Sequence, residues 1–304
     1  MPELPEQVQI VEVGPRDGLQ NEPENVTTAH KLAFIGHLAK AGLTQIEATS
    51  FVHPKAVPQL ADAMDVISGL PDASDVIFSA LVPNQKGLER AIESGVRRIA
   101  VFTAASETFT QKNINMTIEE SFAVFQPVVE SALREGISVR GYVSTAFVCP
   151  YEGEIPKEKV RDVSERLLTM GIDEVAISDT IGAAAPNDVL STVGHVMERI
   201  PTEKIALHFH DTYGTALANV YAGLQLGIKT FDASAGGLGG CPYAPGASGN
   251  LATEDLIYFL DRMNIRSNVD LNTVVSAADG MAKVLDRSLS SRQWKRLRPA
   301  SGCQ

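Results

Sequence analysis

The 304-residue sequence contains few cysteines, and their spacing excludes two common uses of this residue. The cysteines present lie far apart, at Cys149, Cys241 and Cys303. A disulfide-stapled domain carries more cysteines at shorter spacing, and a structural zinc site needs close pairs of them. The pattern therefore indicates neither a disulfide framework nor a structural zinc motif, and we expect reduced thiols.

Positive charge is also scarce. Lys and Arg total 26 against 37 Asp and Glu, which gives a formal net charge of −11 and a pI of about 5.1. A nucleic-acid surface needs a basic face, so we expect no nucleic-acid partner. An anionic substrate remains compatible with this composition where local Lys, Arg or backbone N–H groups meet its charge.

Long hydrophobic runs are absent as well. No segment approaches the roughly 18 apolar residues that a membrane-spanning helix requires, so we expect no membrane association. Residues 1–7, Met-Pro-Glu-Leu-Pro-Glu-Gln, have neither the basic nor the apolar region of a secretory signal. We therefore expect a cytoplasmic protein.

The sequence does contain a regular alternation of short β-branched runs with longer segments of helical periodicity. Strands are predicted at residues 8–13, 45–49, 76–82, 98–103, 138–144, 174–178, 205–210 and 230–235. Eight parallel strands in about 250 residues favour an α/β fold of the closed (β/α)8 TIM-barrel type. The alternative is a doubly wound open sheet. Its first turn usually reads Gly-x-Gly-x-x-Gly, whereas this one reads Gly-Pro-Arg-Asp-Gly.

No Pro- or Ser-rich linker divides the chain, so we predict one TIM-barrel catalytic domain over residues 1–304. The barrel should span about residues 7–263, and helical periodicity predicts a C-terminal extension at about 264–289. We expect a solvated basic tail at residues 290–304, which contains Arg292, Lys295, Arg296 and Arg298.

The first predicted strand is followed by an Arg16–Asp17 pair, at the end of the barrel where TIM-barrel enzymes have their active sites. An isolated Arg–Asp pair is usually a surface ion pair of little energetic value. Here it follows a buried strand that contains a carboxylate. Because side chains alternate between the two faces of a strand, we place Val11 and Val13 against the helices and Glu12 inside the barrel.

The second predicted strand repeats this pattern with Glu47 between Ile46 and Ala48, so Glu47 is also expected in the interior. A buried acidic group can be a structural partner for an arginine. Two of them on adjacent strands beside Arg16 favour a polar functional site, because buried charges need partners.

The seventh predicted strand carries two histidines, His208 and His210, that project to the same face. Two imidazoles one strand step apart can bind one divalent cation. Asp17 and Asn250 can supply further oxygen donors, and this mixture of nitrogen and oxygen ligands suits Mg²⁺ or Mn²⁺.

A glycine-rich segment at residues 236–250 follows the eighth predicted strand. Its glycines permit positive φ angles and movement, and it carries one thiol, Cys241, and one carboxamide, Asn250. A loop in this position is typical of an active-site lid.

Four motifs occur in order along residues 7–286. They are Glu-Val-Gly-Pro-Arg-Asp-Gly-Leu-Gln-Asn-Glu at 12–22, Ser-Asp-Thr at 178–180, His-Phe-His-Asp at 208–211 and Gly-Gly-Leu-Gly-Gly-Cys-Pro-Tyr-Ala at 236–244. Together they resemble the hydroxymethylglutaryl-CoA lyase family, part of the DRE-TIM metallolyase superfamily of TIM barrels. The cysteine-containing loop is the most specific of the four, since the Arg–Asp turn and the His pair are shared across that superfamily.

The resemblance implies a role for each polar residue. It implies Mg²⁺ or Mn²⁺ as cofactor, with the ligands Asp17, His208, His210 and Asn250. The catalytic residues would be Arg16, Asp17, Glu47, His208 and Cys241. Arg16 would contact the thioester carbonyl oxygen of the substrate, together with Gln20 as a second substrate-binding residue. The supporting residues would be Glu12 and Asp179.

The reaction that the resemblance implies is the retro-Claisen cleavage of (S)-3-hydroxy-3-methylglutaryl-CoA to acetyl-CoA and acetoacetate, as in leucine degradation. The partner would be an acyl-CoA substrate, and the assembly a homodimer. Two alternatives stay open within the superfamily: a lyase for a related hydroxyacyl-CoA, and a synthase that condenses acetyl-CoA with a 2-oxo acid. A non-catalytic metal-binding barrel is disfavoured, because a scaffold needs no acid, base and lid.

Overall fold

The computed structural model describes residues 3–240 and 249–298. Its central strands are β1 (Gln9–Glu12), β2 (Gln45–Ser50), β3 (Ile77–Leu81), β4 (Arg98–Ala104), β5 (Ser138–Ser144), β8 (Glu174–Asp179), β9 (Ile205–Phe209) and β10 (Thr230–Ala233). All pair in parallel, and they close in the order β1-β10-β9-β8-β5-β4-β3-β2. The TIM-barrel prediction is therefore confirmed, and pairing between β1 and β10 excludes an open sheet.

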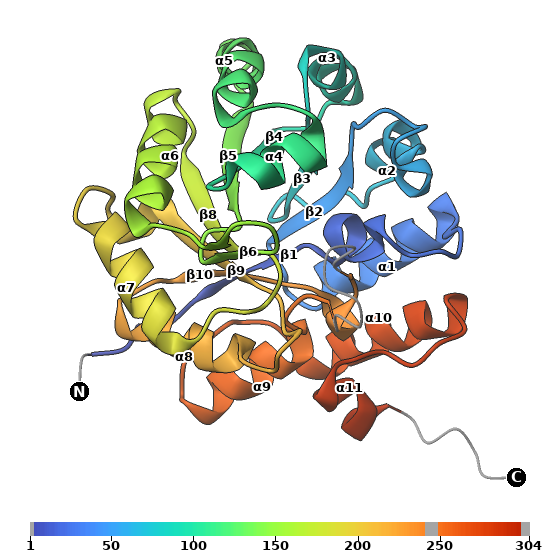
Figure 1. Cartoon of the computed structure of the whole chain (residues 1–304). Helices are drawn as coiled ribbons and strands as arrows, with labels where there is room; N and C mark the ends of the chain where they lie inside the picture. Colours follow the sequence, from blue (N-terminus) through green and yellow to red (C-terminus); the bar gives the residue numbers. More distant parts are fainter. Residues whose placement is uncertain (1–2, 241–248, 299–304) are drawn as a thin grey trace, which may run out of the picture.

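Helices form a ring around this barrel, seen along its axis in Figure 1. They are α1 (Thr28–Lys40), α2 (Ala63–Ser68), α3 (Gln85–Ser94), α5 (Ile118–Arg134), α6 (Lys157–Thr169), α7 (Pro186–Met197), α8 (Ala216–Gln225) and α9 (Thr253–Arg262). A further helix, α4 (Glu107–Ile114), lies inside this ring over the barrel opening. Local chemistry sets several boundaries. The Thr117 side chain accepts from the Glu120 N–H to cap the start of α5, and Gly95, at φ +79°, ends α3.

The strands bury both faces, as expected for a parallel barrel. Outward-facing residues such as Leu207 and Phe209 pack with the helices in the main hydrophobic core. The interior contains only a small apolar cluster, with Leu81, Ala100 and Ala206 among its members. The rest of the interior is available for polar side chains.

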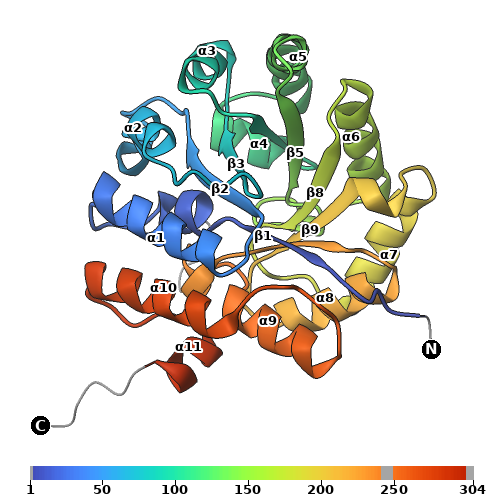
Figure 2. The same cartoon turned by 180° about the vertical axis from the view of Figure 1, so that it is seen from behind.

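Residues beyond the barrel form α10 (Leu271–Val284) and α11 (Arg292–Leu297). The helix α10 packs against α1, α9 and α11, and Figure 2 shows these elements side by side along one edge. The segment predicted as a C-terminal extension thus contains the helix α10.

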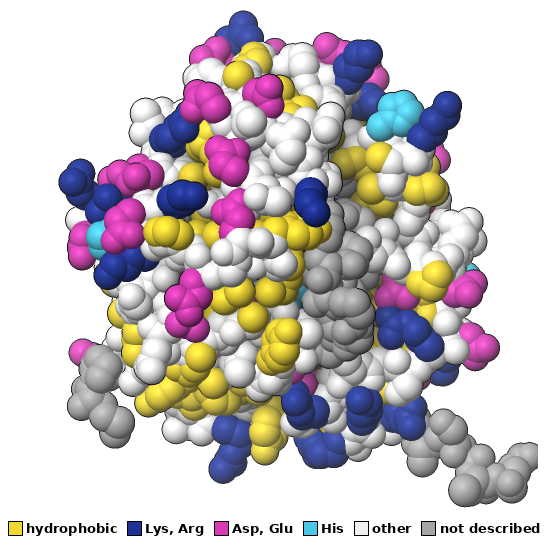
Figure 3. All heavy atoms as spheres, viewed as in Figure 1, with side chains coloured by type: hydrophobic (Ala, Val, Ile, Leu, Met, Phe, Trp, Pro, Cys, Tyr) yellow, Lys and Arg dark blue, Asp and Glu magenta, His cyan; other side chains and the backbone are white. Residues whose placement is uncertain are grey.

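The expected solvated tail needs a correction at residues 292–297, which form α11. Trp294 is only 2% exposed, because the helix docks this ring against the core. The Ser291 side chain and the Asp255 carboxylate accept from its first N–H groups. The flanking basic side chains are exposed, and Figure 3 shows Lys and Arg side chains along the lower edge of this face.

Two features of the barrel top were not predicted. The helix α4 follows β4, and a short antiparallel hairpin of β6 (Val148–Cys149) and β7 (Gly153–Glu154) follows β5. In the described ranges, no helix has the length and apolarity needed to cross a membrane.

Candidate active site

A wide turn, η1 (Gly14–Gly18), directly follows β1 and carries Arg16 and Asp17. The N–H groups of Asp17 and Gly18 donate to the Val13 carbonyl oxygen at 2.8 and 3.1 Å. Wide helical turns of this type occur often at functional sites. The turn places two opposite charges at the carboxyl end of the barrel, as predicted.

Arg16 is held between two carboxylates. Its Nε donates to Glu47 Oε2 at 2.8 Å, and its Nη1 donates to Asp17 Oδ1 at 2.7 Å. The guanidinium is nearly buried, at 7% exposure, which strengthens both ion pairs. The structure therefore brings Arg16, Asp17 and Glu47 together, and it places Glu47 in the interior as predicted.

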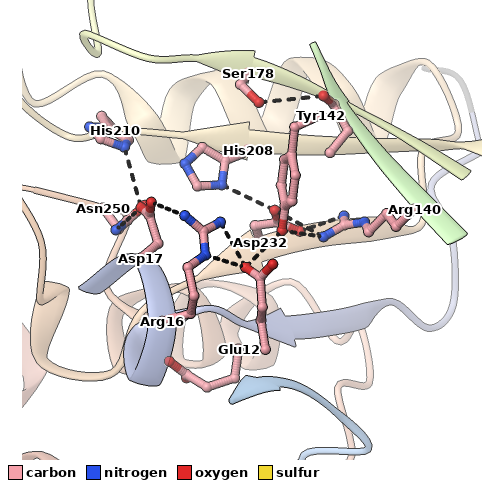
Figure 4. A network of polar contacts seen from close by, with 12 residues as sticks. Glu12, Arg16, Asp17, Arg140, Tyr142, Ser178, His208, His210, Asp232 and Asn250 are labelled. Atoms are coloured by element: carbon pink, nitrogen blue, oxygen red, sulfur yellow. Dashed lines mark hydrogen bonds and ion pairs between the residues drawn. The ribbon is translucent and has the colours of Figure 1, made fainter. Parts of the chain in front are cut away.

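Asp17 lies beside the two histidines. Ligand atoms of Asp17, His208 and His210 all lie within 4.8 Å of one another. The backbone of Asn250 forms an isolated antiparallel β-bridge with that of His210, and the Asn250 Nδ2 donates to Asp17 Oδ2 at 2.9 Å. The four residues predicted as ligands thus converge on one point at the barrel mouth (Figure 4).

Polar atoms in this cluster fit a divalent cation. Asn250 Oδ1 is buried and has no hydrogen-bond partner among the described residues, and His210 Nε2 approaches Asp17 Oδ2 at 3.9 Å. Burial alone would raise the pKa of Asp17, but the charge of Arg16 and the neighbouring His208 hold that pKa well below its usual range. Burial and the nearby His208 lower the pKa of His210 to about 4. An ionised carboxylate and a neutral imidazole are the protonation states that metal ligation requires.

Three further side chains, none of them predicted from the sequence, complete the polar interior. Arg140 makes a bidentate contact with Asp232, at 2.7 and 3.2 Å, and donates to Tyr142 Oη at 3.0 Å. Asp232 Oδ2 lies 3.0 Å from His208 Nδ1, and Tyr142 donates to Glu47 at 3.1 Å. We call this set the interior network: Arg16, Asp17, Glu47, Arg140, Tyr142, His208 and Asp232. Figure 4 labels its members other than Glu47. The alternation rule that found Glu47 applies equally to the missed residues.

A cavity of about 450 Å³ opens above the network. Its polar lining residues include Arg16, Asp17, Tyr142 and the two histidines, and Gln20, predicted to bind substrate, also lines the cavity. Leu81, Phe102, Phe109 and Ile114 are among its apolar lining residues. A ligand with both polar and apolar portions matches this mixed lining.

Glu12 does not lie where the sequence analysis placed it. Its register partners on β10 and β2 are Ala233 and Ile46, which face the helices, so Glu12 faces the helix layer and not the barrel interior. Both faces of β1 are buried, and the valines beside Glu12 therefore could not identify the outer face. Its carboxylate accepts from the N–H groups of Gly14 and Ala235 and from the Thr253 hydroxyl at 2.7 to 2.9 Å.

Gly14 has to be small in this arrangement, because a Cβ there would lie 2.5 Å from Glu12 Oε1. Glu12 thereby connects the turn that carries Arg16 to the end of β10 and to the start of α9. Burial raises the pKa of Glu12 to about 7.

Two other carboxylates outside the barrel wall resemble Glu12, because each accepts hydrogen bonds from backbone N–H groups and has a raised pKa. Asp179 accepts from the N–H groups of Ala183 and Ala184 at 3.1 and 3.0 Å, and burial raises its pKa to about 6. Glu254 accepts from the Gly236 N–H, and burial raises its pKa to about 8. We call Glu12, Asp179 and Glu254 the outer anchors. None forms an ion pair with a basic side chain within residues 3–240 and 249–298.

Cys241, the predicted catalytic thiol, lies outside the described residues. Gly240, which precedes it, lines the cavity, and Asn250 returns the chain to the candidate metal site. Cys149 is buried beside the Ser106 hydroxyl at 3.0 Å and does not line the cavity.

Known proteins match both this sequence and this geometry. The HMGL-like family model matches residues 7–280. Hydroxymethylglutaryl-CoA lyase YngG of Bacillus subtilis is 50% identical over 288 residues, which covers 95% of this chain and 96% of that protein. The crystal structure of hydroxymethylglutaryl-CoA lyase from Pseudomonas aeruginosa is 47% identical, with a TM-score of 0.95, and the match covers 97% of this chain and 98% of that one.

A third match comes from a complex. An HMG-CoA lyase from Acinetobacter baumannii, solved with coenzyme A and 3-methylmalate, is 38% identical with a TM-score of 0.93 and covers 100% of this chain and 99% of its own. Near-complete coverage in both directions leaves no large unmatched region. The chain therefore belongs to the HMGL-like family and, within it, to the hydroxymethylglutaryl-CoA lyases, which are carbon–carbon lyases.

Proposed function

We propose that this protein cleaves 3-hydroxy-3-methylglutaryl-CoA to acetyl-CoA and acetoacetate with the help of a divalent cation. The observation that carries the proposal is the convergence of Asp17, His208, His210 and Asn250 beside Arg16 at the wall of one cavity. An acyl-CoA substrate is supported by the coenzyme A bound in the A. baumannii relative.

The metal ligands in this proposal are Asp17, His208, His210 and Asn250. Two imidazoles with two oxygen donors suit Mg²⁺ or Mn²⁺. When bound, such a cation acts as a Lewis acid and makes a hydroxyl group easier to deprotonate. The four side chains supply the charge and the fixed geometry that hold it.

Arg16 is proposed to stabilise the negative charge that develops when the C2–C3 bond of the substrate breaks. That charge resides on the thioester oxygen of the acetyl-CoA enolate. The contacts of Arg16 with Glu47 and Asp17 leave further guanidinium N–H groups for this oxygen. Because both carboxylates fix the guanidinium before substrate binds, little reorganisation is needed during the reaction.

Two proton transfers complete the reaction. His208 and Asp17 both line the cavity near the candidate metal site. Because a metal-bound His208 that donates through Nδ1 has no free lone pair, Asp17 is the proposed acceptor of the proton of the tertiary hydroxyl group. We propose that Cys241 donates the proton to the acetyl-CoA carbanion, because the chain reaches the cavity wall at the preceding residue, Gly240.

Thiol alkylation tests the role of Cys241. A thiol-directed reagent should inactivate the enzyme, and a saturating substrate analogue should slow the inactivation. C241S should bind metal normally but turn over far more slowly, while modification of the buried Cys149 should play no part. Near-normal turnover by C241S would show that the thiol is not the acid.

The outer anchors have a supporting part in this proposal. Glu12 holds the turn that carries Arg16 and Asp17, and Asp179 holds the backbone that follows β8. A cytoplasmic location and a homodimer complete the proposal; light scattering of the purified protein tests the latter.

A coupled assay tests the function directly. Purified protein is incubated with 3-hydroxy-3-methylglutaryl-CoA and Mg²⁺, and acetoacetate and acetyl-CoA are measured in parallel. Equal amounts of both products are expected. Condensation of acetyl-CoA with a 2-oxo acid, without cleavage, would instead indicate a synthase, and faster cleavage of another hydroxyacyl-CoA would indicate a different lyase.

A further inference from the structure

We propose that Asp232, held in place by Arg140, positions the His208 ring and fixes Nε2 as the atom that His208 offers to the metal. This inference rests on the proposed metal site and concerns residues that lie behind it. Neither Asp232 nor Arg140 lines the cavity, so both would act through His208 and not on the substrate.

The contact between His208 and Asp232 has the geometry of a buried hydrogen bond. His208 Nδ1 lies 3.0 Å from Asp232 Oδ2, and both side chains are buried. An ionised carboxylate can only accept hydrogen bonds, so the proton of a neutral imidazole resides on Nδ1. The lone pair is then on Nε2, the nitrogen that faces away from Asp232. Metal-binding histidines commonly have a carboxylate partner of this kind, which fixes both ring orientation and tautomer.

Asp232 cannot turn away from this contact. Arg140 binds both of its oxygens, at 2.7 and 3.2 Å, in a bidentate pair with fixed geometry. Arg140 is itself held, because its Nε lies 2.7 Å from Glu174 and its Nη1 donates to Tyr142. The paired guanidinium of Arg140 favours the ionised form of the Asp232 carboxylate, so this group accepts hydrogen bonds and does not donate them.

Charge balance alone does not account for all the contacts of Asp232. If Asp232 only balanced the charge of the buried Arg140, it would not need a histidine beside its Oδ2 atom. Glu174 already provides Arg140 with one opposite charge. The contacts instead form a series that runs from Glu174 through Arg140 and Asp232 to His208. The four side chains come from β8, β5, β10 and β9, and the series ends at the candidate metal site.

The tautomer can be measured without any substitution. In ¹⁵N-labelled, metal-free protein at a pH where histidines are neutral, imidazole nitrogen shifts distinguish a protonated Nδ1 from a protonated Nε2. H208Q assigns the signal among the six histidines. We expect protonation at Nδ1; protonation of His208 at Nε2 would overturn the inference.

Metal affinity tests the positioning role. By calorimetric titration with Mn²⁺, D232N should bind about 10–100-fold more weakly than the unmodified protein. The matched control is D62N, which removes a carboxylate charge from another buried cation, Lys31, at 2.6 Å and away from the cavity. D62N should bind Mn²⁺ normally. Affinity of D232N equal to that of the unmodified protein would contradict the inference.

A double variant separates positioning from charge balance. If Asp232 serves only to neutralise Arg140, then R140Q/D232N, which removes both charges, should recover normal Mn²⁺ affinity. If Asp232 positions His208, the double variant should bind as weakly as D232N. Failure of the unmodified protein to bind Mn²⁺ would count against the proposed function, whereas normal binding by the double variant would count against this inference alone.

Discussion

Glu12 and Glu47 lie near the carboxyl ends of neighbouring strands, yet their carboxylates belong to different regions of the molecule. Glu47 faces the barrel interior and contacts Arg16 and Tyr142. Glu12 faces the helix layer, where its partners are backbone N–H groups and one hydroxyl. The interior network therefore contains charged carboxylates paired with arginine, whereas the outer anchors are held without a cation.

The difference shows that burial alone does not determine what a carboxylate can do. Arginine partners lower the pKa of Asp17 and Asp232 despite burial, so these groups stay negative and can face a metal or its histidine ligand. The outer anchors lack such partners, and burial raises their pKa values to between about 6 and about 8. These carboxyl groups accept hydrogen bonds from loop N–H groups and so hold loops against the barrel.

Removing a carboxylate from the interior network should have the largest effect. D17A deletes a proposed metal ligand, so we expect loss of Mn²⁺ binding and a fall in kcat/KM of about 10³-fold or more, because a bound cation stabilises developing charge by several kcal/mol. The control is D173A, which breaks an ion pair with Arg98 at the opposite end of the barrel. Equal losses in the two variants would show that the two ends of the barrel do not differ in function.

The guanidinium group of Arg16 is the second target. R16Q keeps some donor capacity but loses the charge, and we expect kcat to fall by about 10²–10³-fold with little change in KM, since one oxyanion donor is worth roughly 3–4 kcal/mol. Steady-state kinetics with Mg²⁺ check this. An effect confined to KM would make Arg16 a ground-state binding residue.

The smallest effect is expected at an outer anchor. E12Q imitates the protonated form of Glu12, so it should keep the contacts to Gly14, Ala235 and Thr253 and retain activity close to normal. By contrast, E47Q removes a charge that Arg16 needs and should lose activity.

Stability against pH sharpens this comparison. The folded protein holds the Glu12 proton up to about pH 7, whereas the unfolded chain loses it near pH 4.5. The contribution of Glu12 to the free energy of unfolding is thus complete below pH 4.5 and is lost as pH rises toward 7, by about 3 kcal/mol at most. Urea unfolding at several pH values should show a flatter dependence for E12Q. An unchanged slope would mean that Glu12 is ionised in the folded protein.

Much of this fold could be predicted because strand and helix periodicity are local properties of the sequence. The eight parallel strands followed from the repeated strand and helix periodicity, and the His208–His210 pair and the interior position of Glu47 followed from alternation along single strands. Alternation did not determine the face of Glu12, because both faces of β1 are apolar. When a carboxylate lies between two valines on a strand of a parallel barrel, the sequence does not show whether it faces the helix layer or the interior.

The missed part of the site depended on contacts between distant segments. Arg140 and Asp232 are 92 residues apart, and neither residue alone indicates its partner. Each nevertheless interrupts an apolar strand, as Glu47 does, and that signal was available. Similarly, the buried Trp294 lies in a basic segment, and only docking of α11 against the core explains its burial.

The central claim is that Asp17, His208, His210 and Asn250 hold a divalent cation that cleavage requires. The most direct measurement titrates Mn²⁺ into metal-free protein and follows bound Mn²⁺ by electron paramagnetic resonance and acetoacetate production in the same samples. The account predicts one Mn²⁺ per chain, with turnover absent at zero occupancy and rising in proportion to bound metal. Full turnover in metal-free protein, or Mn²⁺ binding that leaves turnover unchanged, would contradict it.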